Sequence, residues 1–204
     1  MQPFPVFIII VVVALIFKIF MSRSSKNYDP NRDFWEKERR ADLTPAKSLD
    51  DMSYINVPVE ELPLDITTDS PEISEMQENI RVLADKKILN FTGISNTDLK
   101  LTYGAANINF LITCDMNYTR LVQNIARLAE AYLNLGLKSE ARQLFEYGIS
   151  IGTDDKKNYL LLADIYTDSG ESSKISGLLE TARTLNSLSK DSIISALESA
   201  VQNA

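Results

Sequence analysis

Few residues in this chain have side chains that could do catalytic chemistry. The 204 residues include a single cysteine, Cys114, and no histidine. Histidine is the side chain that most often acts as general base for a nucleophile and most often binds a metal ion. The sequence also contains no glycine-rich phosphate loop, no metal-spaced cysteines and no nucleophile elbow. We therefore expect neither an enzyme nor a bound metal or cofactor.

The remaining candidates for chemistry have a structural explanation. Cys114 lies on the apolar stripe of a helix expected over residues 97–114, where a thiol packs as a small apolar group. Asp154 and Asp155 are adjacent carboxylates, but they follow Gly152 and precede a helical pattern, as residues that cap a helix do. We expect Cys114 in the core and the two aspartates at a helix N-terminus.

The charge is distributed unevenly along the chain. Residues 1–60 contain eight Lys or Arg and eight Asp or Glu, whereas residues 61–204 contain thirteen and twenty. An acidic domain repels phosphate backbones, and no arginine-rich stripe compensates for this charge. Nucleic acid is therefore not an expected partner, and no small-molecule substrate is indicated.

The first 21 residues have the composition of a membrane anchor. Apolar side chains run from Pro3 to Met21 with only Lys18 between them, and nineteen helical residues span about 28 Å, close to the hydrocarbon thickness of a bilayer. The alternative is a cleaved signal peptide, but no cation precedes the apolar run and no clear cleavage site follows it. We expect a single-pass anchor that contacts the bilayer through residues 3–21, and we therefore expect the protein to be located in the cell membrane.

Cations determine the expected orientation of this anchor. Lys18, Arg23, Lys26 and Arg32 all follow the apolar run, and none precedes it. The positive-inside rule then places the N-terminus outside the cell and the C-terminal domain in the cytoplasm.

Residues 22–70 form an expected connector that prolines interrupt. A short helix is expected over 31–40, where Phe34 and Trp35 are either solvated or held at the membrane surface or the domain. Residues 53–59 alternate apolar and polar side chains, but Pro58 excludes a central strand. We expect an extended segment across the helices, which serves packing or, alternatively, recognition.

Residues 71–204 form the expected all-α domain. Ser70 and Pro71 start a helix that is expected to run to about residue 88, and Ser95 to Asp98 cap the helix over 97–114. A final helix over 189–202 is expected to cap the domain.

Between these helices the sequence repeats itself after 34 residues, in units of about 122–155 and 156–189. Each unit contains an apolar helix, a glycine turn and a second apolar helix, as in a helical solenoid. The matching positions are Ile125 with Tyr159, Leu128 with Leu162, Ala129 with Ala163, Tyr132 with Tyr166, Gly136 with Gly170, Ala141 with Ile175, Phe145 with Leu179, and Gly148 with Ala182.

These residues resemble the tetratricopeptide repeat (TPR). Leu128, Ala129, Tyr132, Ala141, Phe145 and Gly148 occupy the offsets of that family's signature in the first unit. The chain departs from it in three ways: alanine replaces the glycine after leucine in both units, Ile175 and Leu179 replace a small residue and an aromatic, and the closing proline is missing. The whole chain also resembles uncharacterised membrane-anchored proteins of Gram-positive-type bacteria, a likeness that implies no activity.

The TPR resemblance implies a protein or peptide partner bound in a groove that the first helix of each unit lines. Because this groove is acidic and lacks a lysine and asparagine clamp for a C-terminal carboxylate, we expect basic or apolar segments to bind there. Alternatively, these side chains are ordinary solvated residues. The expected groove residues are Gln123, Ala126, Glu130, Leu133, Asn134, Lys157, Leu160, Asp164, Thr167 and Asp168.

Two functions follow from this organisation. The first is a membrane-tethered scaffold for protein interactions, whose tether raises the effective concentration of its binding surface near other membrane proteins. The alternative is a structural subunit of a membrane-associated envelope or secretion assembly, in which the apolar helix associates laterally.

Overall fold

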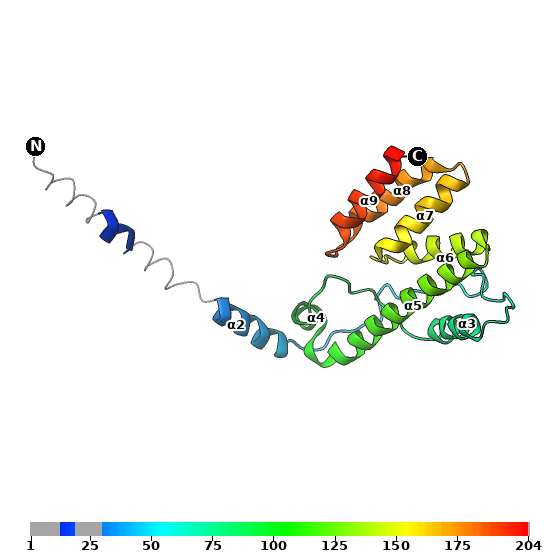
Figure 1. The fold of residues 1–204 in the computed structure, drawn as a ribbon. Helices are drawn as coiled ribbons and strands as arrows, with labels where there is room; N and C mark the ends of the chain where they lie inside the picture. The colour runs from blue at the N-terminus through cyan, green and yellow to red at the C-terminus, as the bar shows by residue number, and fades with distance from the viewer. Residues whose placement is uncertain (1–12, 19–29, 204) are drawn as a thin grey trace, which may run out of the picture.

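The structure of the chain, a computed structural model, describes residues 13–18 and 30–203. These residues are helical wherever they are regular, and they include no strand, which confirms the predicted all-α class. Figure 1 shows the arrangement of the helices. They are α2 (Pro30–Asp42), α3 (Pro71–Ala84), α4 (Asn96–Tyr103), α5 (Ile108–Asn134), α6 (Lys138–Ser150), α7 (Lys156–Asp168), α8 (Ile175–Thr184) and α9 (Lys190–Asn203), with 3-10 turns η1 (Ala105–Asn107) and η2 (Ser172–Lys174).

The anchor predicted for residues 3–21 lies outside the described residues, apart from 13–18. Residues 13–18 are helical, and Val13, Leu15, Ile16 and Phe17 are exposed. Over the described ranges, no helix combines the length and the apolar character that crossing a membrane requires.

α3 starts where the sequence predicts but ends earlier. Pro71 is its first residue, and Ser70 precedes it in an extended conformation. The helix stops at Ala84 rather than near residue 88. Ile88 is still fully buried, because its carbonyl accepts a hydrogen bond from Ile55 N–H at 3.0 Å and the extended connector covers it. The connector therefore packs against the residues that were expected to form the last turn of α3.

The single helix predicted for residues 97–114 is wrong, because the chain breaks at Gly104. Gly104 has a φ of 95°, and a Cβ there would lie 2.3 Å from the carbonyl oxygen of Pro45. The connector crosses the chain at this point, so α4 ends and α5 begins after η1. α5 then continues unbroken for 27 residues into the first repeat unit.

Cys114 occupies the position that the sequence predicts. It is 1% exposed and packs in a small cluster with Leu89, Phe91, Leu99 and Leu111. Burial raises the pKa of its thiol, which keeps the thiol protonated. The cysteine is therefore a core residue.

The second half of the connector is part of the packed domain. Residues 53–57 are neither helix nor strand, and Val57, Leu62 and Leu64 are buried in the same core as the repeat helices. Arg81 on α3 donates a hydrogen bond to Leu64 O at 2.7 Å. The core thus begins well before residue 71, the domain boundary expected from composition.

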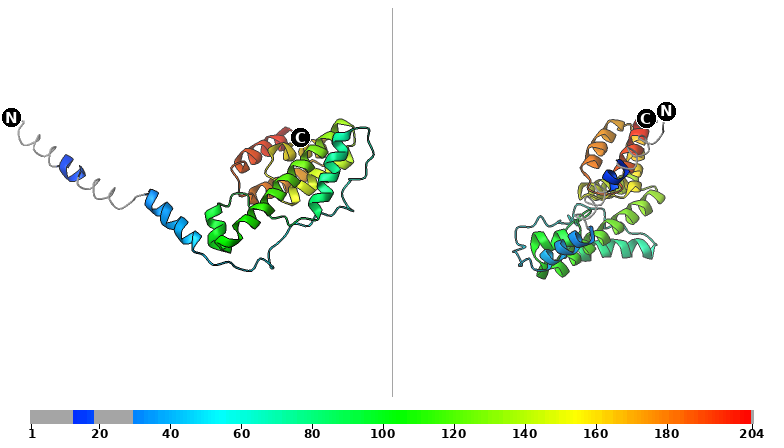
Figure 2. Two further views of the ribbon diagram at one scale, coloured as in Figure 1. Left: turned by 90° about the horizontal axis from the view of Figure 1, so that it is seen from below. Right: turned by 90° about the vertical axis from the view of Figure 1, so that its left-hand side faces the viewer.

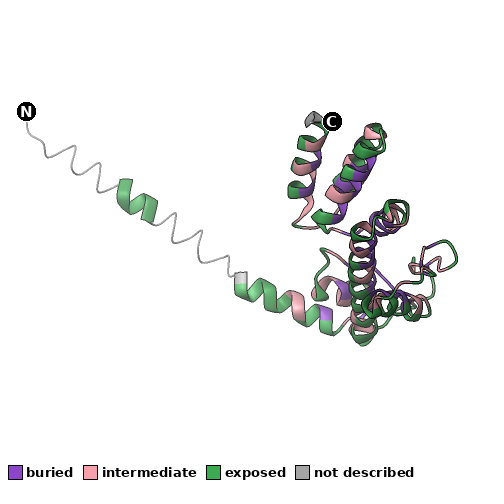
Figure 3. Cartoon of the chain, turned by 45° about the vertical axis from the view of Figure 1, so that its right-hand side comes forward, coloured by how far each residue is buried: buried purple, intermediate pink, exposed green. Residues whose placement is uncertain are grey.

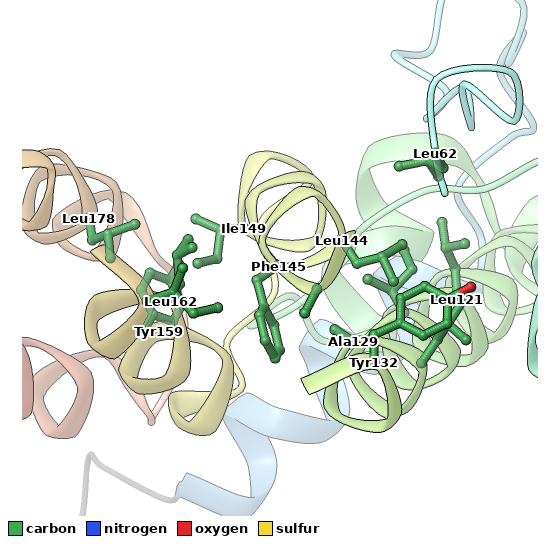
Figure 4. Close-up of a cluster of buried hydrophobic side chains, with 14 of the residues drawn as sticks. Leu62, Leu121, Ala129, Tyr132, Leu144, Phe145, Ile149, Tyr159, Leu162 and Leu178 are labelled. Atoms are coloured by element: carbon green, nitrogen blue, oxygen red, sulfur yellow. The ribbon is translucent and has the colours of Figure 1, made fainter. Parts of the chain in front are cut away.

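The two repeat units form two helical hairpins, α5 with α6 and α7 with α8. Both hairpins turn at a glycine, Gly136 with a φ of 78° and Gly170 with a φ of 72°. The hairpins share one hydrophobic core, and Figure 4 shows Phe145 of α6 between side chains of α5 and of α7. α9 closes the far end, where Ile193 and Leu197 are fully buried.

Candidate functional site

The predicted groove residues lie on α5 and α7, the first helices of the two hairpins. Gln123, Asn134, Lys157, Asp164 and Thr167 are exposed, and Glu130 is half-buried. We call these six residues the α5–α7 face.

An ion pair joins the two helices across this face. Lys157 Nζ lies 2.7 Å from Glu130 Oε2. Lys157 is held at the start of α7 by Asp155, whose carboxylate caps the helix and accepts a hydrogen bond from Lys157 N–H at 2.9 Å. The predicted helix cap is confirmed, and it places Lys157 against the neighbouring hairpin.

Two predicted groove residues belong largely to the core. Ala126 is only 7% exposed, so little of its side chain is open to a ligand. Leu133 is partly buried and packs against the main core. Both residues are next in sequence to fully buried residues, Ile125 and Tyr132. Because α5 packs against α3 as well as α6, it buries a wider stripe of side chains than a helix in a single hairpin does. Leu160 is half-buried on α7.

Asp168 lies at the turn end of the hairpins, away from the Glu130–Lys157 pair. Its carboxylate is 2.7 Å from Lys138 Nζ at the start of α6. Two of the predicted acidic groove residues, Glu130 and Asp168, therefore already have cationic partners. The negative charge available to a ligand is concentrated at Asp164, which is exposed on α7.

A hollow between α3 and α5 adds acidic residues that sequence analysis missed. It has a volume of about 480 Å³, and Glu72 and Glu75 of α3 line it together with Glu130, Asn134 and Arg127 of α5. No local pattern reveals this hollow, because it exists only where α3 packs beside α5. It extends the acidic character of the α5–α7 face toward α3.

A polar network fixes the second hairpin against the first. Arg142 on α6 lies 2.6 Å from a carboxylate oxygen of Glu171, and 2.8 Å from one of Glu146. Tyr166 on α7 donates a hydrogen bond to Glu146 at 2.8 Å. Hydrogen bonds from Arg142 and Lys174 lower the pKa of Glu171 to about 2, so the carboxylate stays ionised at neutral pH. The network joins α6 of the first hairpin to α7 and to the turn that follows α7.

Aromatic contacts strengthen the same junction. The guanidinium of Arg142 lies 5.1 Å from the ring centroid of Tyr166, and Lys174 Nζ lies 5.5 Å from it. Burial raises the pKa of the Tyr166 hydroxyl, which remains a hydrogen-bond donor.

The site thus consists of a helical scaffold with a polar face and a shallow acidic hollow. Such a surface can bind another chain through charge and shape. Comparisons of the chain with models of known protein families, with curated proteins and with solved structures gave no match.

Proposed function

We propose that this protein is a membrane-tethered scaffold that binds a protein or peptide partner along the α5–α7 face. The observation that carries the proposal is the pair of equivalent hairpins, 34 residues apart, whose first helices are joined by Glu130 and Lys157 at 2.7 Å. The resemblance to TPR proteins supports the same use of these helices. The tether is the apolar segment 3–21, with the helical domain on the cytoplasmic side.

Charge favours a basic partner segment. Asp164 on α7 is exposed, and Glu72 and Glu75 line the adjacent hollow with only Arg127 as a cation among its lining residues. A lysine- or arginine-containing segment with apolar side chains fits this surface, whereas an acidic C-terminal peptide meets repulsion from like charges.

A peptide-binding experiment tests the proposed preference. Binding of fluorescent peptides is measured by anisotropy, with a basic apolar peptide compared against an acidic C-terminal peptide. The substitution Asp164→Lys, which reverses one interfacial charge, is expected to weaken binding of the basic peptide by about fivefold. The matched control is Glu61→Lys, which changes an exposed carboxylate on the connector. Stronger binding of the acidic peptide would contradict the preference.

Removal of residues 1–21 separates the scaffold from the alternative, a structural subunit of a membrane assembly. A scaffold without its anchor should still bind the peptide in solution and should no longer float with vesicles of phosphatidylcholine alone. A laterally associating subunit should instead lose its complex together with the anchor.

A further inference from the structure

α2 contacts the rest of the domain through one of its faces. Ala41 is fully buried, and Lys37 lies 2.7 Å from Asp98 of α4. Lys100 of α4 lies 3.2 Å from Glu38 and 2.7 Å from Asp42. Figures 1 and 2 show that α2 runs outward from the helical body beside α4. The other faces of α2 are therefore uncovered.

The uncovered part of α2 exposes large apolar side chains. Trp35 is 64% exposed and Phe34 is 53% exposed, with their rings edge to face at 5.3 Å between centroids. Leu43, just after the helix, is 76% exposed, and its N–H donates to Arg39 O at 3.2 Å, which continues the helical turn. Trp35, Arg39 and Leu43 are spaced four residues apart, so they lie along one stripe. Figure 3 shows how little of α2 is buried.

The charges on this uncovered surface are favourable for an anionic partner. Lys100 binds the carboxylates of Glu38 and Asp42, so α4 removes two of the four acidic residues of α2 from the outer surface. Three arginines remain there with two carboxylates, and one of the arginines, Arg32, lies 3.9 Å from Glu36. The outer surface is thus cationic on a chain whose net charge is -7. Its members are Arg32, Arg39, Arg40, Asp33 and Glu36.

The position of α2 in the chain identifies the partner. Eight residues separate Met21, the end of the apolar segment, from Pro30. Nine peptide units span at most about 30 Å, so a tethered chain cannot carry the start of α2 farther than this from the bilayer. Exposed aromatic rings beside arginines are characteristic of helices that lie in the interface between lipid and water.

We propose that α2 lies on the surface of an anionic bilayer. Phe34, Trp35 and Leu43 enter the headgroup boundary, and Arg39 and Arg40 bind lipid phosphates. The interface makes α2 a second contact with the membrane, which orients the α4 side of the domain toward the lipid. This inference rests on the tether in the proposed function.

Trp35 is the single tryptophan of the chain, so its fluorescence reports on this surface directly. The full-length protein is reconstituted into vesicles of phosphatidylcholine alone, and into vesicles of phosphatidylcholine and phosphatidylglycerol at three to one. In the anionic vesicles we expect Trp35 emission to shift to shorter wavelength and to lose intensity when the lipid acyl chains are brominated. The double variant Arg39→Gln, Arg40→Gln should lose both effects.

The matched control is Arg120→Gln with Arg183→Gln, which removes one exposed arginine each from α5 and α8 and should keep the shift and the quenching. Vesicle flotation is measured on the same samples and reports on the tether. Two results would overturn the role of α2 and leave the tether intact. In the first, the protein floats but Trp35 is quenched in neither type of vesicle. In the second, the quenching of Trp35 is the same with and without the Arg39 and Arg40 substitutions. Failure to float with either vesicle would overturn both.

Discussion

Tyr132 and Tyr166 occupy the same position in the two repeat units, and each hydroxyl bonds to the element that precedes its hairpin. Tyr132 donates to Pro63 O at 2.7 Å and accepts from Gln77 Nε2 at 2.8 Å, which joins α5 to the connector and α3. Tyr166 donates to Glu146 and joins α7 to α6. The repeated tyrosine is therefore both a core residue and a link to the preceding element.

Substitution of Tyr132 by phenylalanine tests this link. Tyr132→Phe removes both hydrogen bonds and leaves the buried Gln77 amide with one partner fewer. We expect the free energy of unfolding to fall by about 1–2 kcal/mol, as measured by urea denaturation.

Tyr118→Phe is the matched control. The Tyr118 ring is also buried in α5, but its hydroxyl makes no well-aligned hydrogen bond. Its removal should change stability by less than about 0.5 kcal/mol. Equal losses in both variants would show that the Tyr132 hydroxyl does not link the elements.

At the scale of the element, the hairpin turns are built from the same hydrogen bonds. Leu137 N–H donates to Tyr132 O at 2.9 Å, and Gly136 N–H donates to Leu133 O at 3.0 Å. In the second unit Glu171 N–H donates to Tyr166 O at 2.7 Å, and Gly170 N–H to Thr167 O at 3.0 Å. Both are glycine-dependent C-terminal caps, because the residue after the helix must adopt a positive φ.

The substitution Gly136→Ala tests the turn without a steric clash, because no atom lies within 4 Å of the added Cβ. We expect a loss of about 1 kcal/mol, the cost of a left-handed conformation for an L-residue. The control is Gly177→Ala within α8, where the added Cβ also meets nothing. Replacing a glycine inside a helix by alanine has the opposite effect and should raise the free energy of unfolding by roughly 0.5–1 kcal/mol. Thermal unfolding of the two variants should therefore shift in opposite directions.

At the scale of the whole molecule, one core extends from the connector to α9. Val57, Tyr132, Phe145, Tyr159 and Leu197 belong to the same cluster of buried side chains. Because each hairpin buries its apolar surface on its neighbours, neither hairpin has a complete core of its own. The two units should unfold together.

The substitution Phe145→Ala tests this shared core. Phe145 is fully buried between the hairpins, and its truncation should lower the free energy of unfolding by about 3–5 kcal/mol. Amide hydrogen exchange should accelerate in α5 and α7 alike, while urea unfolding remains a single transition. Acceleration confined to α6 and its own hairpin would indicate two independent units.

The sequence alone was sufficient to predict those features whose physical cause lies within one short segment of the chain. The two turn glycines require a positive φ, and the caps at Ser95 and Asp155 bond to backbone N–H groups within three residues. The 34-residue repeat and the burial of Cys114 follow from helical periodicity, which one segment contains by itself.

Only the tertiary structure determines the features that depend on which distant segment packs against a given residue. Gly104 breaks a periodic apolar pattern because the backbone at Pro45 and Ala46 occupies the space of a Cβ. Ala126 is lost to the core, and Glu130 is paired with Lys157, because packing sets the neighbours of each helix face. Periodicity fixes the angle of a side chain around its own helix axis, but the identity of its contacts depends on the placement of distant segments.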